Sequence, residues 1–363
     1  MTVLFAQSER PSKFSEVVGD EVNSRVLLSI AKDPSNTPHV LILSGSYGCG
    51  KTTSARLLYR AMNCTNFING KSRDVCGTCP NCLLKQDQLR YLHEYDSSTI
   101  NKKDGILKIR DTFSYGTGGN WGVYIFDECH LLSHEVQSAL LKVFEENVGR
   151  NKYVLCTTDP DYVLPTIRSR SIELTYTQKS IQQVETALRK CAEKHNLELS
   201  DDAYRIIAQR SNGGMRDAYM LLQKYTLIGK DLFMSEMTNF EDGMSLFMRT
   251  LVTYNKKKVP PKQDLVNSLI TKLLSMPVAT FRIEYQSYLN QMMHYAMFHD
   301  ETKVSKSVSR LVTQLEGFGM MNLHMLVRYC IQNWVIDGFR DDMGTQNVLL
   351  ALISGAADME MVS

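Results

Sequence analysis

The chain of 363 residues has no apolar run that approaches the ~20 residues of a membrane-spanning helix. Its first residues lack the basic start and the long apolar core of a signal peptide. Internal repeats and low-complexity segments are missing as well. These absences argue against a membrane protein and against a secreted protein, and we therefore expect a cytoplasmic protein.

Excess charge is also nearly absent, because 41 Lys and Arg residues face 39 Asp and Glu residues and leave a formal net charge of +2. So small a charge gives no global field, and any anionic polymer must be held by a local patch. The hydrophobic content of 43% is ordinary for a globular protein, and the length suits two or three domains. In a cytoplasmic chain, nine cysteines are expected to be thiols or metal ligands rather than disulfides.

Short apolar runs alternate with helical patterns in the first half of the chain, which predicts a parallel sheet with helices on both faces. After about residue 180 the strand patterns stop, and helical spacing continues to the end. We therefore predict an α/β domain at 1–178, a small helical domain at 179–242 and an all-α domain at 243–363. A polar stretch near 234–244 is expected to separate the last two. The predicted strands are 39–45, 91–96, 121–128 and 152–158, and the predicted helices lie near 52–63, 104–114 and 133–147.

The stretch GSYGCGKT, residues 45–52, matches the pattern G-x-x-x-x-G-K-[ST] between a predicted strand and a predicted helix. Glycines let successive backbone N–H groups curl around a phosphate, and the positive end of the following helix faces the same anion. Lys51 can reach the β- and γ-phosphates, and the Thr52 hydroxyl can bind Mg²⁺. The alternative is a glycine-rich turn that matches by chance. The candidate nucleotide-binding residues of this loop are Gly45, Gly48, Cys49, Gly50, Lys51, Thr52 and Thr53.

An acidic pair supports this interpretation, because the run VYIFDECH is a predicted strand that ends in Asp127 and Glu128. Asp127 is expected to hold Mg²⁺ through its water shell, and Glu128 is expected to polarise the attacking water. Two solvated acids at a strand end are the ordinary alternative, which is less plausible one βα unit beyond a phosphate loop. The two motifs together predict nucleotide hydrolysis, with Lys51 and Glu128 as catalytic residues.

Four cysteines follow the glycine loop and its helix with the spacing C-x11-C-x2-C-x2-C. Two x2 spacings that share one cysteine let three thiolates converge on one ion, and the fourth can complete a tetrahedral zinc site. All four ligands would come from the protein, so the site is expected to be structural rather than catalytic. A redox C-x-x-C pair is the alternative. The predicted zinc ligands are Cys64, Cys76, Cys79 and Cys82.

The segment SSTINKKDG, residues 97–105, follows a predicted strand and opens a predicted helix. Its hydroxyl, amide and ammonium groups are donors of the kind that contact a phosphate backbone without reading bases. The candidate DNA-contacting residues are Thr99, Asn101 and Lys102. A capped and solvated helix start would have the same composition, so both interpretations stay open.

Several segments within the first 230 residues resemble the AAA+ ATPase subunits of DNA polymerase clamp loaders, and most closely the bacterial gamma/tau subunit. The segment SRS at 169–171 matches the Ser-Arg-Cys signature of that family except at its last residue, which suggests a diverged branch such as a phage enzyme. The other matching segments are RPSKFSEVVGDE at 10–21, GCGKTTSARLLYRAMNC at 48–64, FDECHLLSHEVQSALLKVFEE at 126–146, LCTTDP at 155–160 and SNGGMRDAYMLLQK at 211–224.

The resemblance implies a subunit of a homo- or hetero-pentameric ring that uses ATP to open a sliding clamp and place it on primer–template DNA. It also implies that the third domain is a collar that holds the ring together, that a zinc module lies at the cysteine cluster, and that the helix after residue 97 lines the DNA channel. The location would be the cytoplasm of a bacterial cell or of a phage-infected bacterial cell.

The resemblance also assigns roles to single residues. Arg10 and Val18 match positions beside the adenine, and Thr157 matches the sensor 1 position. Arg216 matches the sensor 2 arginine, and Arg170 matches the arginine finger that acts in trans on a neighbouring subunit. Two neighbours of similar chemistry, Thr158 and Arg168, are the alternatives for Thr157 and Arg170.

Two other functions remain open at this stage. One is a nucleotide-binding scaffold subunit of the loader that has lost turnover, against which the intact Lys51, Asp127 and Glu128 argue. The other is a different AAA+ machine that remodels DNA, such as a Holliday-junction motor. The cysteine insertion and the SRS segment argue against that alternative.

Overall fold

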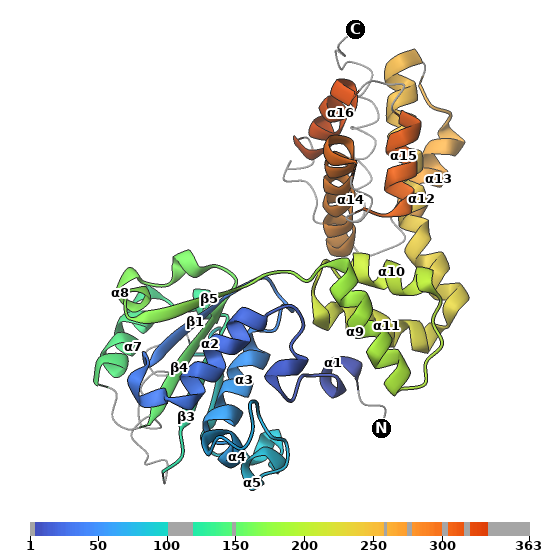
Figure 1. The fold of residues 1–363 in the computed structure, drawn as a ribbon. Coiled ribbons are helices and arrows are strands. Elements are labelled where there is room, and N and C mark those ends of the chain that lie inside the picture. The colour runs from blue at the N-terminus through green and yellow to red at the C-terminus, as the bar shows by residue number, and fades with distance from the viewer. Residues whose placement is uncertain are drawn as a thin grey trace. The chain divides into compact units, whose positions relative to one another are not determined.

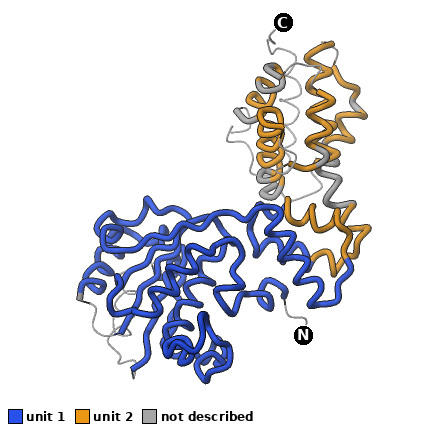
Figure 2. Tube along the Cα trace, in the orientation of Figure 1, with its two compact units in different colours: residues 1–198, 210–223 blue, residues 199–209, 224–363 orange. Residues whose placement is uncertain are grey.

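A computed structural model describes residues 4–100, 119–146, 150–257, 260–273, 278–299, 304–315 and 320–332. The chain divides into two compact units (Figure 2). Unit 1 comprises residues 1–198 and 210–223, and unit 2 comprises residues 199–209 and 224–363. The division into three domains predicted from the sequence follows other boundaries and stays a prediction.

Unit 1 contains a five-stranded parallel sheet in the order β2-β3-β4-β1-β5 (Figure 1). The parallel α/β core expected from the alternating pattern is therefore confirmed. The predicted strands correspond to β1 to β4, whereas β5 was not predicted. The strands are β1 Val40–Gly45, β2 Leu92–Asp96, β3 Gly122–Asp127, β4 Asn151–Thr157 and β5 Ser171–Tyr176.

Helices cover both faces of this sheet, and each face has its own hydrophobic cluster. Alternate residues of β1 enter opposite clusters: Leu41 packs with α2 and α3, and Ile42 packs with α7. A strand that is buried on both faces needs a continuous apolar run, which is the pattern seen in the sequence. The helices of unit 1 are α1 Phe5–Ser8, α2 Glu21–Lys32, α3 Lys51–Met62, α4 Thr65–Ile68, α5 Pro80–Leu83, α7 His134–Glu146, α8 Pro165–Arg168, α9 Ile181–Lys194 and the first part of α11.

The predicted helices near 52–63 and 133–147 correspond to α3 and α7. The helix predicted near 104–114 lies outside the described residues. Short 3₁₀ helices lie between the main elements: Phe14–Glu16, Pro34–Asn36, Gln86–Gln88, Cys129–Leu131 and Pro160–Tyr162.

All regular elements in the described residues of unit 2 are helices, as the sequence predicts for this part of the chain. One hydrophobic cluster runs from Met244 to Cys330, where α12 packs against α13 and α15, and α14 packs against α15 and α16. The helices are α10 Asp201–Arg210, the rest of α11 Met215–Ile228, α12 Lys230–Lys257, α13 Gln263–Leu273, α14 Val278–Phe298, α15 Lys306–Leu315 and α16 Met320–Gln332.

The stretch near 234–244, which is predicted to separate two domains, lies inside α12, a helix of 28 residues. The stretch is polar, but Met, Glu and Phe are compatible with a helix. The single glycine, Gly243, costs only about 1 kcal/mol relative to alanine. Packing of Met244, Phe247 and their neighbours in the hydrophobic cluster outweighs that cost.

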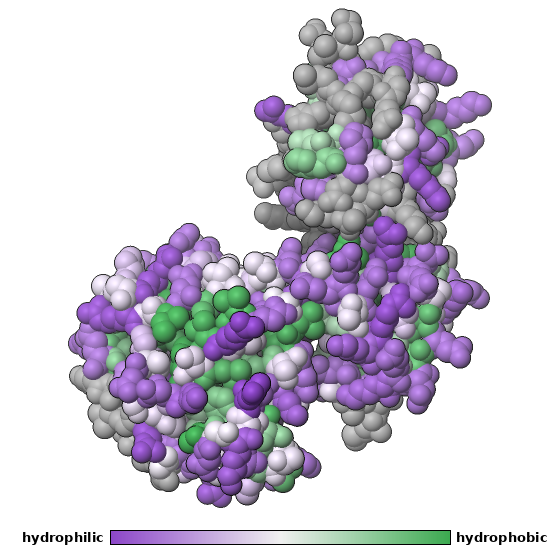
Figure 3. Space-filling model, in the orientation of Figure 1, coloured by the Kyte–Doolittle hydropathy of each residue, from purple (hydrophilic) through white to green (hydrophobic). Residues whose placement is uncertain are grey.

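The surfaces of the two units differ in the space-filling view (Figure 3). Hydrophobic side chains gather in the middle of the visible face of unit 1, with hydrophilic side chains around them. The described part of unit 2 shows mostly hydrophilic side chains on its visible face. Contiguous apolar surface of this kind is typical of an interaction site.

Candidate functional site

The glycine loop connects the carboxyl end of β1 to the first residue of α3, Lys51. The Lys51 side chain folds back over the loop, and its Nζ donates to the carbonyl oxygens of Gly45 at 2.7 Å and of Ser46 at 2.9 Å. Gly48 has φ +71° and Gly50 has φ +109°, in the left-handed region that favours glycine. The loop therefore has the backbone shape and the cation of a phosphate cradle.

Two oxygen ligands lie side by side next to this loop. The Thr52 hydroxyl donates to the Asp127 carboxylate, with Oγ1 at 3.1 Å from Oδ2. Asp127 is the last residue of β3, so the strand end and the helix start present a hydroxyl and a carboxylate to the same point. Hard oxygen ligands of this type suit Mg²⁺.

Glu128 follows in a left-handed conformation, with φ +53°, which is uncommon for a residue with a side chain. Burial raises the pKa of its carboxyl, the Lys51 charge opposes this shift, and the Asp127 charge adds to it. A carboxyl with a raised pKa is suited to accept a proton near neutral pH.

His130 connects Glu128 to the predicted sensor residue. Its Nδ1 lies 3.4 Å from Glu128 Oε2 and 3.3 Å from Thr157 Oγ1. Thr157 is the buried last residue of β4, and its hydroxyl also donates to the carbonyl oxygen of Asp159 at 2.9 Å. Thr157 is therefore linked to the acidic pair through one imidazole ring.

The start of α11 lies against the glycine loop, since the Met215 amide donates to the Gly48 carbonyl at 3.2 Å. A Cβ atom on Gly48 would lie 3.4 Å from the Cα of Gly214 and 3.6 Å from the Cβ of Arg216. The additional glycine of the loop thus allows both the left-handed backbone and a close approach of α11. Arg216 and Lys51 line the same cavity.

A cavity of about 1040 Å³ collects most of the predicted nucleotide-binding residues. Its size is adequate for a ligand larger than a typical drug molecule. Gly45, Thr157 and Arg170 are not among the lining residues. The predicted residues that line it are Arg10, Val18, Gly48, Cys49, Gly50, Lys51, Thr52, Thr53, Asp127, Glu128 and Arg216.

The sequence did not reveal an ion pair between Lys179, which lines the cavity, and Asp20. Both side chains are almost fully buried. Burial raises the pKa of the Asp20 carboxyl, and the Lys179 ammonium opposes this shift. The Lys179 amide also donates to the Gly213 carbonyl at 3.1 Å, which ties the segment before α9 to the segment before α11. Asp20 lies within the segment that resembles the family opening, but no pattern distinguishes Lys179.

A second cluster that the sequence missed contains Glu9, Cys191 and His195, whose potential ligand atoms lie close together. Lys194 contacts the Glu9 carboxylate of this cluster. Glu9 Oε1 lies 2.7 Å from His195 Nε2 and 3.0 Å from Lys194 Nζ. Burial opposes ionisation of Glu9, but hydrogen bonds from His195 and Lys194 lower the pKa of its carboxyl. These contacts join the segment after α1 to the last turn of α9 as an ion-pair cluster.

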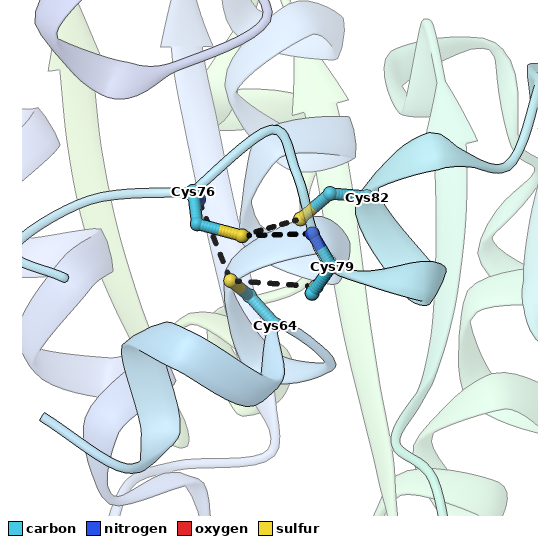
Figure 4. Close-up of side chains that lie close together, drawn as sticks. All are labelled: Cys64, Cys76, Cys79 and Cys82. Carbon is cyan, nitrogen blue, oxygen red and sulfur yellow. Dashed lines mark hydrogen bonds between the residues drawn. The ribbon is translucent and has the colours of Figure 1, made fainter. Parts of the chain in front are cut away.

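The four predicted zinc ligands converge in the insertion after α3 (Figure 4). All four sulfur atoms lie within 4.8 Å of one another, and the pairs Cys76–Cys82 and Cys64–Cys79 are each 3.9 Å apart. A tetrahedral zinc with bonds of ~2.3 Å needs sulfur atoms about 3.8 Å apart. The donor set and its spacing therefore fit zinc.

Backbone donors contribute to this cluster. Burial opposes ionisation of Cys76, but N–H groups of Thr78 and Cys79 lower the pKa of its thiol to about 5. Burial raises the pKa of Cys64 and of Cys82, so a bound cation is needed to hold all four residues as thiolates.

The two arginines near β5 differ in their partners. Arg168 forms ion pairs with Asp161 at 2.9 Å and Glu173 at 3.3 Å. Arg170 pairs with Glu145 at 3.1 Å and donates to the Thr166 carbonyl, and its side chain is 51% exposed. Arg170 is therefore more accessible to another chain than Arg168.

The candidate DNA contacts are only partly described. Thr99 is exposed, and its hydroxyl donates to the Asp96 carbonyl at 2.8 Å in the turn after β2. Asn101 and Lys102 lie outside the described residues. The contact between this segment and DNA stays a prediction.

The strand order, the glycine loop after β1, the acidic pair after β3 and the helical C-terminal part define an AAA+ ATPase fold. Residues 23–180 match the family described as DNA polymerase III, delta subunit. The chain is related to the DNA polymerase III gamma/tau subunits, as its motifs predict.

The curated relatives include the gamma/tau subunit of Mycobacterium tuberculosis strain H37Rv, 31% identical over 219 residues, which are 59% of this chain and 37% of that protein. The tau subunit of Escherichia coli K12 is 32% identical over 222 residues, which are 60% of this chain and 34% of that protein. The gamma subunit of Buchnera aphidicola subsp. Baizongia pistaciae is 24% identical over 332 residues, 88% of this chain and 87% of that protein. The chain thus spans a little over a third of the length of the gamma/tau relatives that it matches.

Among solved structures, the RuvB Holliday junction branch migration motor of Thermotoga maritima aligns with a TM-score of 0.48 and 22% identity. The alignment covers 77% of this chain and 91% of that chain. No helix in the described part of the chain has both the length and the apolar character to cross a membrane.

The close contact between Gly213 and Lys179 predicts how a substitution at Gly213 changes the stability of the protein. Gly213 has φ +74°, and a Cβ atom there would lie 2.6 Å from the Lys179 carbonyl oxygen. We expect Gly213→Ala to lower the free energy of unfolding by at least ~2 kcal/mol, because backbone strain and a backbone clash add together. Urea denaturation measures this change.

Gly70→Ala is the matched control. Gly70 has φ +71° but nothing within 4 Å of the added Cβ, so this variant carries only the backbone strain. That strain alone costs about 1–2 kcal/mol. Equal losses in the two variants would contradict a specific role of the contact with Lys179.

Proposed function

We propose that this chain binds and hydrolyses ATP with Mg²⁺ as a subunit of a clamp loader that opens a sliding clamp and places it on primer–template DNA. One observation carries the proposal: Lys51, Thr52, Asp127, Glu128 and Arg216 line the same cavity. The similarity to the DNA polymerase III gamma/tau subunits supports the replication context. A cytoplasmic location is part of this proposal.

The roles of the residues follow from their positions. The loop amides and Lys51 would hold the phosphates, and Thr52 and Asp127 would hold Mg²⁺, which neutralises charge on the phosphates. Glu128 would orient and polarise the attacking water. His130 lies beside Glu128 and contacts Thr157, and this arrangement is suited to keep the Glu128 carboxylate in position.

The remaining predicted residues complete the proposal. Arg10 and Val18 line the same cavity as the phosphate loop, which is consistent with contact to the adenine. Arg216 would bind the phosphates of its own chain. Arg170 does not line its own cavity, and its exposed guanidinium supports action on a neighbour in a ring of five subunits.

The other predicted parts are included in the same proposal. A zinc ion at the four cysteines would be structural, because all four ligands come from the chain. Thr99, Asn101 and Lys102 would contact the DNA backbone, and residues 243–363 would form the collar of the ring, with residues 1–178 and 179–242 as the core and the lid. The apolar surface of unit 1 supports assembly with other subunits.

Two variants test ATP turnover. Lys51→Ala should abolish tight ATP binding, because the loop offers no replacement cation at the β- and γ-phosphates. Glu128→Gln should bind ATP normally but hydrolyse it at least ~100-fold more slowly, because the shape is kept and the charge that polarises water is lost. Titration calorimetry and phosphate release measure the two properties.

Lys142→Ala, on the exposed face of α7, is the control for Lys51→Ala. If Lys51→Ala binds ATP as the parent does, the phosphate-loop assignment is wrong. If the parent binds ATP and has no turnover with clamp and primed DNA, the chain is the scaffold subunit and not an enzyme.

Metal analysis tests the cysteine cluster. Protein purified without chelators should contain about one zinc per chain, the stoichiometry of a closed Cys₄ site. Cys79→Ser should lower the zinc content, because three sulfur ligands bind zinc less tightly than four. The control Cys191→Ser removes a buried cysteine outside this cluster and should leave the zinc content unchanged. A parent protein without zinc would refute the assignment.

The arginine finger is tested in the assembled complex. Arg170→Ala should leave the ATP affinity of the isolated subunit unchanged, because Arg170 is absent from its own cavity. The variant should reduce hydrolysis stimulated by clamp and DNA by up to ~10³-fold. Complexes that mix Arg170→Ala chains with Lys51→Ala chains should regain part of the rate. Loss of stimulation in Arg168→Ala but not in Arg170→Ala would transfer the role to Arg168.

A further inference from the structure

The cysteine cluster is not isolated from the cavity. Between them runs the segment 12–18, which includes the 3₁₀ helix Phe14–Glu16. On one side of this segment, Ser12, Ser15, Glu16, Val17 and Val18 line the cavity. On the other side, Phe14 packs in the same hydrophobic cluster as Val75 and Cys79. The segment is thus a wall that the cavity and the cysteine insertion share.

Asp74, in the insertion that carries the four cysteines, binds the backbone of this wall. Its carboxylate accepts hydrogen bonds from the amide of Phe14, at 3.2 Å to Oδ1, and from the amide of Ser15, at 2.9 Å to Oδ2. Oδ1 also accepts the amide of Val75 at 2.7 Å, which orients the carboxylate. Hydrogen bonds to a charged acceptor are stronger than those between neutral groups. The three amides on the Asp74 carboxylate therefore hold the wall and the insertion together.

Hydrogen bonds within residues 12–18 also hold the wall together. Glu16 Oε2 accepts the amide of Ser12 at 2.7 Å and the amide of Lys13 at 3.3 Å. These hydrogen bonds tie the start of the segment to Glu16, and Asp74 holds Phe14 and Ser15 from outside the segment. Asp74 is two residues before Cys76, whose own amide donates to Cys64 Sγ at 3.4 Å. Residues 74–76 therefore connect the cysteine cluster to the wall over a short stretch of backbone.

We propose that the cysteine insertion positions the wall of the nucleotide cavity formed by residues 12–18, and that Asp74 is the positioning residue that connects the two. This inference rests on the proposed binding of a nucleotide in the cavity. It gives the insertion a role in nucleotide affinity that is separate from phosphate binding, because the wall is distinct from the glycine loop. The contrary view is that the insertion stabilises only itself and leaves the cavity unaffected.

The test uses the full chain with Asp74→Ala and Asp74→Asn, with ATP and ADP as probes in titration calorimetry. Asp74→Ala should raise both dissociation constants about tenfold, the size of one lost hydrogen bond to a charged group. Asp74→Asn keeps one acceptor oxygen and should raise them about threefold, and it decides the question if the alanine variant does not fold. The zinc content should stay that of the parent, since Asp74 is not a ligand. In turnover, KM should rise while kcat stays unchanged, because no group at the phosphates is altered.

Inorganic tripolyphosphate is the second probe, because it binds at the glycine loop without touching the wall. Its affinity should be the same in the parent and in both variants. Asp87→Ala, an exposed aspartate in the 3₁₀ helix Gln86–Gln88, is the control and should behave as the parent. If the parent binds no nucleotide, the proposed function fails and this inference fails with it. If the parent binds ATP and ADP and the Asp74 variants bind them equally well, only this inference is overturned.

Discussion

The parallel pairing of β1 with β4 on one side and with β5 on the other is the constraint on which the site depends. It brings the carboxyl ends of the three strands together, so that Ser44 lies beside both Thr157 and Thr175. At the next position the backbone of β1 comes so close to β5 that a Cβ on Gly45 would lie 2.1 Å from the carbonyl oxygen of Tyr176. The first glycine of the loop is therefore required by sheet packing before any ligand is considered. Once that strand end is fixed, the loop, the start of α3 and the acid at the end of β3 have little freedom left.

A buried ion pair between Lys179 and Asp20 holds a second part of the cavity lining. Lys179 and Asp20 lie almost without exposure, and a charge in that position is costly unless it is paired. The pair brings together the segment that precedes α2 and the residue that precedes α9, and the amide of Lys179 adds the residues that precede α11. Removal of either partner would leave an unpaired buried charge beside the cavity. Burial also raises the pKa of Glu128, which lines the same cavity as Lys179.

The sequence predicted β1, β3 and β4 because they form nearly continuous apolar runs. The run that predicted β2 is mixed instead, since Leu92 and Tyr95 are interspersed with polar residues. The sequence did not predict β5, whose position at the sheet edge leaves Glu173 and Thr175 exposed and breaks the apolar pattern. It also missed α2, in which one apolar residue, Val22, is 74% exposed and one polar residue, Ser24, is buried. The motif residues were found because phosphate chemistry restricts residue type and spacing together. Lys179 and Asp74 act through contacts with residues about 160 and 60 positions away, and no local pattern records such contacts.

Proximity of ligand atoms does not by itself make a metal site, as the two clusters in unit 1 illustrate. Around the four cysteines, backbone N–H groups favour the thiolate of Cys76, and the sulfur spacing fits a tetrahedral ion. Around Glu9, the Lys194 ammonium already contacts both carboxylate oxygens. Burial raises the pKa of Cys191 to about 12, so its thiol stays protonated. A cation would have to displace an ammonium and a thiol proton there, whereas the four cysteines need only lose protons. Both clusters bring potential ligand atoms within the same distance, but the neighbouring charge makes only the four cysteines suited to a metal ion.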